Sequence, residues 1–389
     1  MSLIKKKVFE IKSAVDSHSA SITDNYGLLS GLAGEILFLY YFEKIYGKQE
    51  YQNIISKIDI LLKSIRRYKS TPAFCSGMSG VFYLTELLKK DSIINIELGK
   101  NIVLYLDKVV NYYISKNKYE FLYGLTGISQ YLLMEPEDYR EQLVKIADYF
   151  DKSKLIINDT YAWEKTTATG NEIDLAISHG ISSIIVFLSK LLDLDLPLSR
   201  RIVIKDMLNK SIEFILSQQN HLSEEIYSYY PYSCHANEKQ DCNSRLAWCY
   251  GDLSIGITLF NAGKACKNTE LTSYAEKILL NAAINRRDQN LNLVQDPGLC
   301  HGASGISAIF YRMWWNTHNL KYLDAALYWT EIAMQMSKYQ NGIAGYVYKS
   351  ANSYRVGTHL LEGVSGIGIS MMFLDTRQEP VWDKCLMIS

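Results

Sequence analysis

Two short phrases of the sequence contain residues that bind metal ions. Residues 248–251 read WCYG and residues 300–302 read CHG, so Cys249 and Cys300 each stand two residues before a glycine. With His301 they supply two thiols and one imidazole. Zinc prefers such ligands and takes four in a tetrahedral site, so three protein ligands leave one position free for chemistry. The residue types and their spacing favour a catalytic zinc site over a closed structural one.

The glycines of both phrases belong to a motif that occurs seven times. It consists of a glycine, two further residues, a second small residue and then an apolar helical pattern. The copies recur at intervals of 46 to 71 residues, which is typical of repeat architectures. They begin at Gly31, Gly77, Gly124, Gly180, Gly251, Gly302 and Gly363. Because the two cysteines occupy equivalent places, the repeat brings them to the same end of neighbouring units, although they are 51 residues apart in sequence.

Each repeat predicts two helices. Apolar residues follow the motif glycine at intervals of three and four, as in residues 181–192, and a second amphipathic pattern lies between the copies, as in residues 54–65. Seven repeats therefore give about fourteen helices in an all-α fold. An open solenoid and a closed ring both fit, and closure is favoured because neither terminal repeat has the polar face of a cap. We predict one domain over residues 1–389.

Two stretches interrupt the repeats. The polar, tyrosine-rich segment 217–244 is predicted to leave the outer helices, and residues 340–357 are predicted to form a short hairpin or loop. The GIAG sequence at Gly342 falls inside this second stretch, and we interpret it as a decoy rather than as an eighth copy.

Composition excludes several classes of protein. Hydrophobic residues make up 48% and charged residues 21% of the chain, which indicates a folded globular protein. The formal net charge is zero, so nothing favours a nucleic-acid partner. No run of 18 apolar residues predicts a transmembrane segment. The 7 cysteines are odd in number and irregularly spaced, which favours a reducing compartment, and hence the cytoplasm, over a disulfide framework.

Residues just before the motif glycines should line one mouth of the ring. His179 directly precedes its glycine, as His301 does, and Glu120 stands four residues before Gly124. Arg245 lies one helical turn before Cys249. These positions favour site roles for His179 and Arg245. For Glu362 a place at the mouth and a bond to helix-terminal amides remain equally open.

Other cysteines offer weaker metal sites. Cys75 also lies two residues before a motif glycine, but its repeat should be distant from the fifth and sixth, so we interpret it as a small buried residue. Cys234, His235 and Cys242 match no zinc-finger or ribbon spacing and are interpreted as surface-loop residues.

At these residues the chain resembles the lanthionine synthetase C-like (LanC) cyclase family. The resemblance covers nearly the whole chain: seven GxxG-type repeats, SHG at 178–180, RLAWCYG at 245–251 and CHG at 300–302. WCYG followed about fifty residues later by CHG is highly specific, whereas a single GxxG is not. The resemblance implies an α/α toroid, a double ring of seven inner and seven outer helices.

The resemblance also implies a reaction. One Zn²⁺ per chain would be held by Cys249, Cys300 and His301, and the fourth position would receive a cysteine thiol of a precursor peptide. The thiolate would add to dehydroalanine or dehydrobutyrine and close a (methyl)lanthionine thioether ring. His179 matches the family histidine proposed for proton transfer, and Arg245 matches the arginine that assists it.

Further positions match less closely. Tyr250 and Trp248 match neighbours of the family's site, and Tyr250 is assigned a hydrogen-bonding role. Glu120 stands where the family often has an aspartate, so its reach is longer, and Ser183 and Ser254 replace motif glycines.

The implied partners are a dehydrated precursor peptide and a separate dehydratase, with an export transporter as a further candidate. The implied location is the cytoplasm, with a peripheral place in a membrane-associated synthetase complex as a variant.

Three alternatives stay open. A LanC-like enzyme would add glutathione or another thiol to dehydroamino acids in proteins, with the same metal and a different nucleophile. A zinc-bearing peptide-binding scaffold would lack turnover, which the presence of His179 and Arg245 disfavours. A helical-ring glycosidase or terpene-type transferase would need paired acids or Asp-rich motifs, which the mouth positions do not supply.

Overall fold

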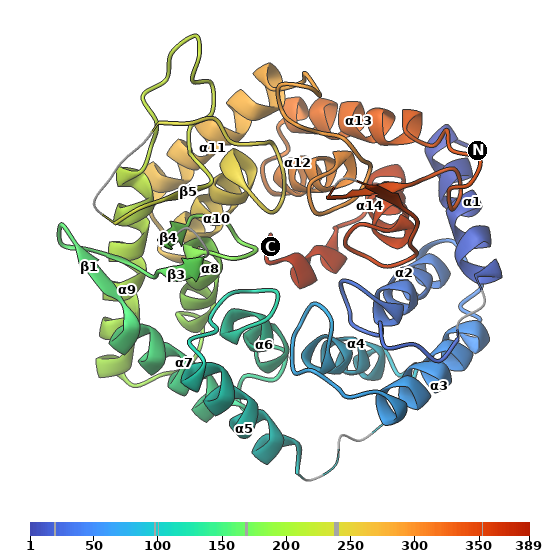
Figure 1. The fold of residues 1–389 in the computed structure, drawn as a ribbon, viewed down its shortest axis with the longest axis horizontal. Coiled ribbons are helices and arrows are strands. Elements are labelled where there is room, and N and C mark those ends of the chain that lie inside the picture. Colours follow the sequence, from blue (N-terminus) through green and yellow to red (C-terminus); the bar gives the residue numbers. More distant parts are fainter. Residues whose placement is uncertain (19–20, 97–98, 100, 168–169, 237–240, 352) are drawn as a thin grey trace. The chain divides into compact units, whose positions relative to one another are not determined.

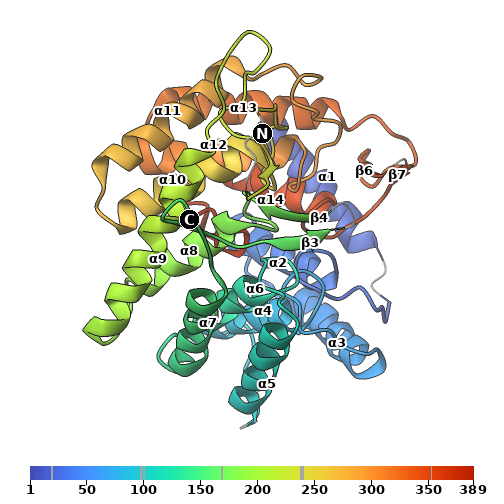
Figure 2. The same cartoon turned by 60° about the vertical axis from the view of Figure 1, so that its left-hand side comes forward.

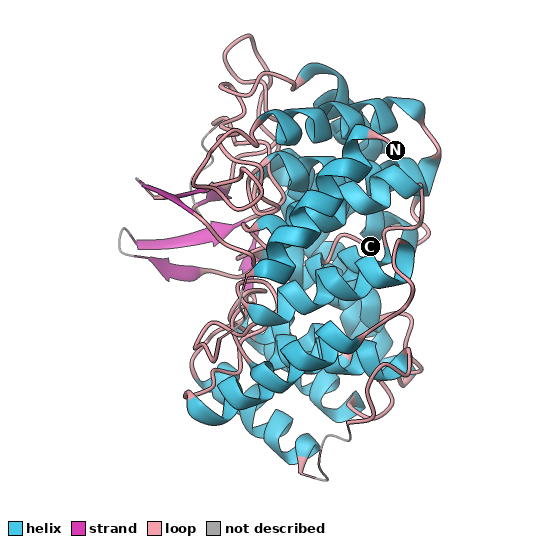
Figure 3. Cartoon of the chain, turned by 90° about the vertical axis from the view of Figure 1, so that its right-hand side faces the viewer, coloured by secondary structure: helices cyan, strands magenta, loops and turns pink. Residues whose placement is uncertain are grey.

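The computed structural model describes residues 1–389 except 19–20, 97–98, 100, 168–169, 237–240 and 352. Within the described residues, fourteen α-helices alternate between a helix that follows a motif glycine and an amphipathic helix. The alternation matches the two helices per repeat predicted from the sequence. The strands, drawn in magenta in Figure 3, are short and have two to five residues each.

The chain divides into two compact units. The first comprises residues 1–102 and 294–382, and the second comprises residues 103–293 and 383–389. The prediction of one domain over 1–389 stays a prediction. No described helix is long and apolar enough to cross a membrane.

The first unit contains the first two and last two repeats. Its helices and strands are α1 (Leu3–Ser17), α2 (Leu32–Ile45), α3 (Gln52–Arg67), α4 (Met78–Lys90), α12 (Ala303–Thr317), α13 (Leu320–Gln335), α14 (Val364–Thr376), β6 (Tyr348–Ser350) and β7 (Ser353–Arg355). The antiparallel pair β6–β7 is the hairpin predicted within residues 340–357. Gly342 lies in a turn before it, as predicted for a decoy motif.

The two ends of the repeat series meet in this first unit. Helix α14 of the last repeat packs against α12 on one side and against α2 of the first repeat on the other. Its outer partner is α1, the amphipathic helix at the start of the chain (Figure 1). An open solenoid leaves its terminal repeats without such a neighbour. These contacts therefore support closure of the repeat series.

The second unit contains the third, fourth and fifth repeats. Its elements are α5 (Ile102–Ser115), which begins at the end of the first unit's sequence, α6 (Leu125–Leu132), α7 (Arg140–Ser153), β1 (Leu155–Ile157), β2 (Thr160–Ala162), β3 (Lys165–Thr167), β4 (Gly170–Asp174), α8 (Ile181–Leu191), α9 (Leu198–Ser217), β5 (Ser233–Cys234), α10 (Gly251–Ala265) and α11 (Thr269–Asn285). A short 3₁₀ helix, η1 (Val381–Leu386), leads to the C-terminus.

Helices that follow the motif glycines form the inner layer of each unit. Every residue of α6 is buried, as are nearly all residues of α8 and α14, whereas α3 and α5 bury one face only. A helix that is apolar on all sides is stable only when it is surrounded. In the second unit α8 packs between α6 and α10, and α9 and α11 cover α8 and α10 respectively.

The short strands of the second unit were not expected from the sequence. The hairpins β1–β2 and β3–β4 fill the long interval between the third and fourth motifs, and Figure 2 shows β3 beside β4. Strand β5 of segment 217–244 pairs with β4. The pairing aligns Ile173 with Cys234 and Asp174 with Ser233. Segment 217–244 thus returns to the loop that precedes α8.

A buried ion pair attaches the same segment to α10. Arg286 Nη1 lies 2.8 Å from Asp252 Oδ2, and their side chains are 3% and 0% exposed. Asp252 also accepts hydrogen bonds from the amides of Tyr229 and Tyr230, while Arg286 donates to the carbonyl of Ser244. Asp252 lies three residues after Cys249, so this network holds the chain on both sides of the WCYG phrase.

Candidate active site

The loops that precede most of the inner helices are closed by a backbone hydrogen bond. Before α2, α4, α6, α12 and α14 the amide after the motif glycine donates to the carbonyl seven residues earlier, for example Ala303 N to Asp296 O at 3.1 Å and Leu125 N to Lys118 O at 3.1 Å. The first amides of a helix have no acceptor within the helix, so the loop supplies one. This bond fixes the residues just before the glycine at the start of the helix.

The motif glycine is required because the loop backbone passes close to it. A Cβ at Gly302 would collide with the backbone oxygen of Asp296, and one at Gly251 would meet the carbonyl of Arg245 at 2.6 Å. Gly251 also has φ +71°, a left-handed conformation that glycine adopts at little cost. Close backbone approach therefore explains why glycine recurs before each inner helix.

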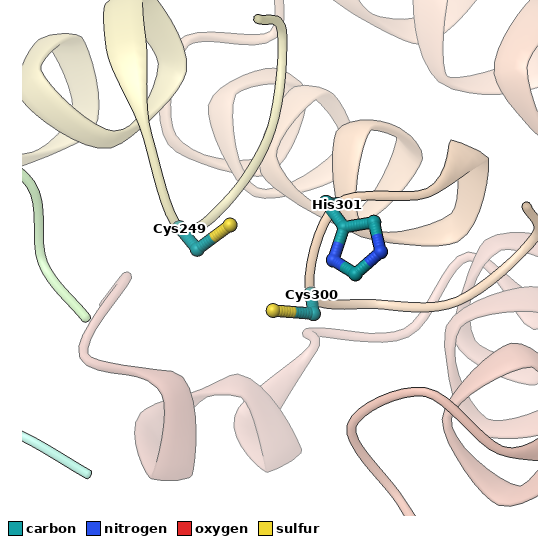
Figure 4. A group of neighbouring side chains, drawn as sticks. All are labelled: Cys249, Cys300 and His301. Atoms are coloured by element: carbon teal, nitrogen blue, oxygen red, sulfur yellow. The ribbon is translucent and has the colours of Figure 1, made fainter. Parts of the chain in front are cut away.

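Cys249, Cys300 and His301 form a group that can hold a metal ion. Cys249 precedes α10, and the other two residues precede α12. Each offers one ligand atom, and these atoms lie within 4.8 Å of one another (Figure 4). Ligand atoms of a tetrahedral zinc site lie about 3.3–3.8 Å apart, so small side-chain rotations suffice to bind the ion. Two thiols and an imidazole fit zinc.

Asp296 is a partner of His301 that the sequence reasoning missed. Its Oδ2 lies 3.0 Å from Nε2 of His301. Burial by itself lowers the pKa of His301, but the bonds to Asp296 and Cys300 outweigh it and raise the pKa to about 10. Burial raises the pKa of Asp296, and the bond to His301 reverses the shift, so that the pKa falls below its ordinary value. An aspartate six residues before a motif glycine, present in both the fourth and sixth repeats, was the available signal.

His179 and Glu120 are paired. Nδ1 of His179 lies 2.9 Å from Oε2 of Glu120, and the two side chains are 33% and 19% exposed. The carboxylate also accepts the amides of Leu122 and Tyr123 in its own loop. Glu120 is therefore anchored by its backbone and engages one ring nitrogen of His179. The sequence placed both residues before motif glycines but did not predict the contact.

Three serines attach the third, fourth and fifth repeats to one another. Ser178, next to His179, donates to the backbone carbonyl of Cys249 at 3.0 Å, so the histidine loop adjoins the cysteine loop. Ser254 accepts the amide of Ile177 at 2.8 Å. The serine that replaces the motif glycine at position 254 therefore has a structural role, because its hydroxyl joins neighbouring loops. Ser183, the other replacement, hydrogen bonds to Thr126 in the third repeat at 3.0 Å.

Arg245 begins the loop that contains Cys249. Its Nη2 donates to the carbonyl of Leu293 at 2.7 Å, and the side chain is partly exposed. One terminal nitrogen of the guanidinium, a cation, is thereby fixed. This geometry fits a positioned cation.

The aromatic residues of the WCYG phrase differ in their surroundings. Trp248 is fully buried, donates from Nε1 to the carbonyl of Leu386 at 2.9 Å and packs edge-on against Phe121. Tyr250 is partly exposed and meets the ring of Tyr232 edge-on at 6.4 Å. Trp248 thus anchors the C-terminal segment, while Tyr250 stands at the surface of the loop. The hydrogen-bonding role assigned to Tyr250 stays a prediction.

The weaker cysteine candidates lie outside the metal group. Cys75 is 2% exposed, as predicted for a buried residue. Cys234 is also buried, so its interpretation as a surface-loop residue was wrong: the pairing of β5 with β4 covers it. Burial raises the pKa of the Cys234 thiol to about 12, which disfavours the thiolate that a metal would bind. Among the described residues, neither His235 nor Cys242 joins a metal-binding group.

Glu362, left open by the sequence, lies near the sixth loop. Burial raises the pKa of its carboxyl group, His301 acts to lower it and Asp296 acts to raise it. Because both residues act electrostatically on its carboxyl group, Glu362 lies close to the loop that contains His301. This favours a place at the mouth over a role that is limited to helix-terminal amides.

The chain belongs to the lanthionine synthetase C-like protein family, whose model matches residues 23–387. Its structure is similar to that of nisin cyclase, with a TM-score of 0.73 at 18% sequence identity, over 99% of this chain and 96% of that chain. This match confirms the predicted fold class, an all-α α/α toroid. A crystal structure of D-mannose isomerase has a TM-score of 0.42 at 12% identity, over 74% of this chain and 72% of that one. No curated protein matches the sequence.

Proposed function

We propose that the protein is a zinc-dependent lanthipeptide cyclase. The observation that carries the proposal is the group of Cys249, Cys300 and His301, whose ligand atoms lie within 4.8 Å of one another. In the described part of the chain the group includes no fourth histidine, cysteine or carboxylate, which suits a site that keeps one position for substrate. Membership of the LanC-like family and the fold shared with nisin cyclase support the assignment.

The metal would supply thiol activation. A free cysteine thiol has a pKa of about 8.5, and coordination to zinc deprotonates it near neutral pH. Two thiolates and a neutral imidazole from the protein would cancel the charge of Zn²⁺. The substrate thiolate would then keep more of its nucleophilicity than it would on a cationic site.

Residues of the second unit would stabilise the negative charge that develops on the substrate and would transfer the proton. Addition of the thiolate to the β-carbon of dehydroalanine or dehydrobutyrine moves charge to the adjacent carbonyl, and Arg245 would stabilise that enolate. His179 would then give a proton to the α-carbon. Glu120 engages Nδ1 of His179, so Nε2 is the nitrogen available for this transfer. Glu120 is thus a positioning residue, and Tyr250 would have a hydrogen-bonding role near the metal ligand.

The substrate would be a dehydrated precursor peptide, which a separate dehydratase would prepare. An export transporter would then act on the cyclised peptide. The cytoplasm is the proposed location, with peripheral attachment to a synthetase complex as the variant. One zinc ion per chain is expected.

A thiol-trapping assay tests the proposal. The zinc-loaded protein is incubated with a dehydrated peptide that contains cysteine, and free thiols are alkylated before mass spectrometry. Ring closure leaves the peptide mass unchanged and removes the alkylation site. A peptide lacking cysteine, with and without glutathione, is the matched control. Adducts formed only with glutathione would assign the LanC-like thiol transferase instead, and binding of peptide without any thioether would assign the scaffold.

A further inference from the structure

The carboxylate of Asp296 has three partners in and around the loop of residues 296–302, which precedes α12 and contains Cys300 and His301. Its Oδ1 accepts the amide of Gly298 at 2.9 Å, and the backbone amide of Lys349 on β6 also hydrogen bonds to the carboxylate. Its Oδ2 lies 3.0 Å from Nε2 of His301 and is shielded from solvent. A buried carboxylate oxygen without a donor is costly, so the imidazole must present a proton on Nε2.

A neutral imidazole carries one proton and one lone pair, and only the nitrogen with the lone pair binds a metal. With the proton on Nε2, the lone pair is on Nδ1. We propose that Asp296 is a positioning residue of the metal centre, which holds His301 through Nε2 so that Nδ1 coordinates the metal. The inference rests on zinc binding at this site, which is part of the proposed function.

The fourth repeat shows that this arrangement is not a general requirement of the loop. Asp174 occupies the same place, six residues before its motif glycine, and its Oδ1 accepts the amide of Ala176 at 2.9 Å. Its Oδ2, however, bonds to Nζ of Lys165 at 2.8 Å. In both repeats one carboxylate oxygen accepts an amide of its own loop. The second oxygen bonds to a different side chain in each repeat, Lys165 in the fourth and His301 in the sixth. In the sixth repeat that group is a metal ligand.

Gly302 makes room for this aspartate. A Cβ at position 302 would collide with both the backbone oxygen and Oδ1 of Asp296. The glycine of the CHG phrase therefore protects the loop that holds the carboxylate in addition to starting α12.

The test compares D296N with D174N. Both substitutions keep an oxygen for the loop amide, but D296N places an amide NH₂ group toward His301 and no longer stabilises the proton on Nε2. Zinc affinity is measured by competition with a chromophoric chelator, after thermal unfolding of the metal-free proteins has shown that they fold. D296N should weaken zinc binding about 10- to 100-fold, in the range of other partners of ligating histidines, and D174N should not. Equal zinc affinity of D296N and the wild type would overturn the proposal.

A second measurement uses the wild type, so the proposal stays testable if D296N does not fold. A crystal structure of the zinc-loaded protein should show Nδ1 of His301 on the metal and Nε2 on Asp296. Coordination through Nε2 would refute the proposal. Absence of stoichiometric zinc from the wild type would instead remove the proposed function on which this inference rests, and so the two failures are distinguishable.

Discussion

Nδ1 of His179 lies 2.9 Å from Oε2 of Glu120, although the two residues belong to different repeats. Glu120 is held by the amides of its own loop, and the loop of His179 is held to Cys249 through Ser178. The carboxylate of Glu120 therefore holds one nitrogen of the imidazole, and Ser178 holds the loop of His179 against the backbone of Cys249. His179 lies outside the group of candidate metal ligands, which fits its proposed role in proton transfer.

Replacement of His179 by glutamine should slow ring closure and spare the metal. A positioned acid or base typically contributes a factor of about 10²–10⁴ in rate, so a loss in this range is expected. Zinc content, measured by atomic emission, should match that of the wild type because His179 lies outside the metal group. Loss of zinc would show that His179 is a ligand.

The contact between His179 and Glu120 provides a second variant that tests the role of His179. E120Q should slow the reaction about tenfold on the wild-type background and have little further effect on the H179Q background, because residues that act through one contact are not additive. Full independent losses from both substitutions would contradict the positioning role of Glu120. Zinc content is again the reference measurement.

Replacement of Cys300 by alanine should remove stoichiometric zinc and abolish cyclisation, since two remaining ligands do not make a tetrahedral site. Cys75 is the matched control: it also lies two residues before a motif glycine, but it is buried and outside the metal group. C75A should therefore keep its zinc. Retention of zinc and activity by C300A would disprove the metal assignment.

The ion pair between Arg286 and Asp252 should be important for stability. Removing one member of a buried pair leaves a charge without a partner, so R286M should lower the free energy of unfolding by about 3–5 kcal/mol. The exposed pair of Lys63 and Asp59 is the control, and K63M should change stability by less than about 1 kcal/mol. Urea titrations of both variants measure the difference. Similar small effects would show that the buried network contributes little.

Stability should also depend on pH through His359. Burial lowers its pKa from 6.5 to about 4, so between these values the unfolded chain binds a proton that the folded protein does not. The free energy of unfolding should therefore rise with pH across this window, and the contribution of His359 should be lost as the pH falls toward 4. H359Q should reduce the loss between about pH 7 and about pH 4 by about 3 kcal/mol. An unchanged pH profile in urea titrations would rule out this contribution.

Much of the fold followed from local patterns. Glycine spacing and apolar periodicity located all seven inner helices, because a helix surrounded by neighbours must be apolar on every side. Hairpins β1–β2 and β3–β4 were missed because their strands of three to five residues contain too few positions to show an alternating pattern. The burial of Cys234 was missed for a related reason, since it depends on pairing with a strand about sixty residues earlier in the chain.

The sequence by itself determined which residues occupy equivalent places before the inner helices, and so it predicted Cys249, Cys300, His301 and His179 as candidate site residues. Equivalence within a repeat is a property of spacing, and spacing can be read from the chain. Only the tertiary structure decided which side chain faces which: Glu120 toward His179, Asp296 toward His301, and Asp174 at the same position toward Lys165. Such contacts depend on the direction of each side chain and on neighbours from distant segments, which no periodicity encodes.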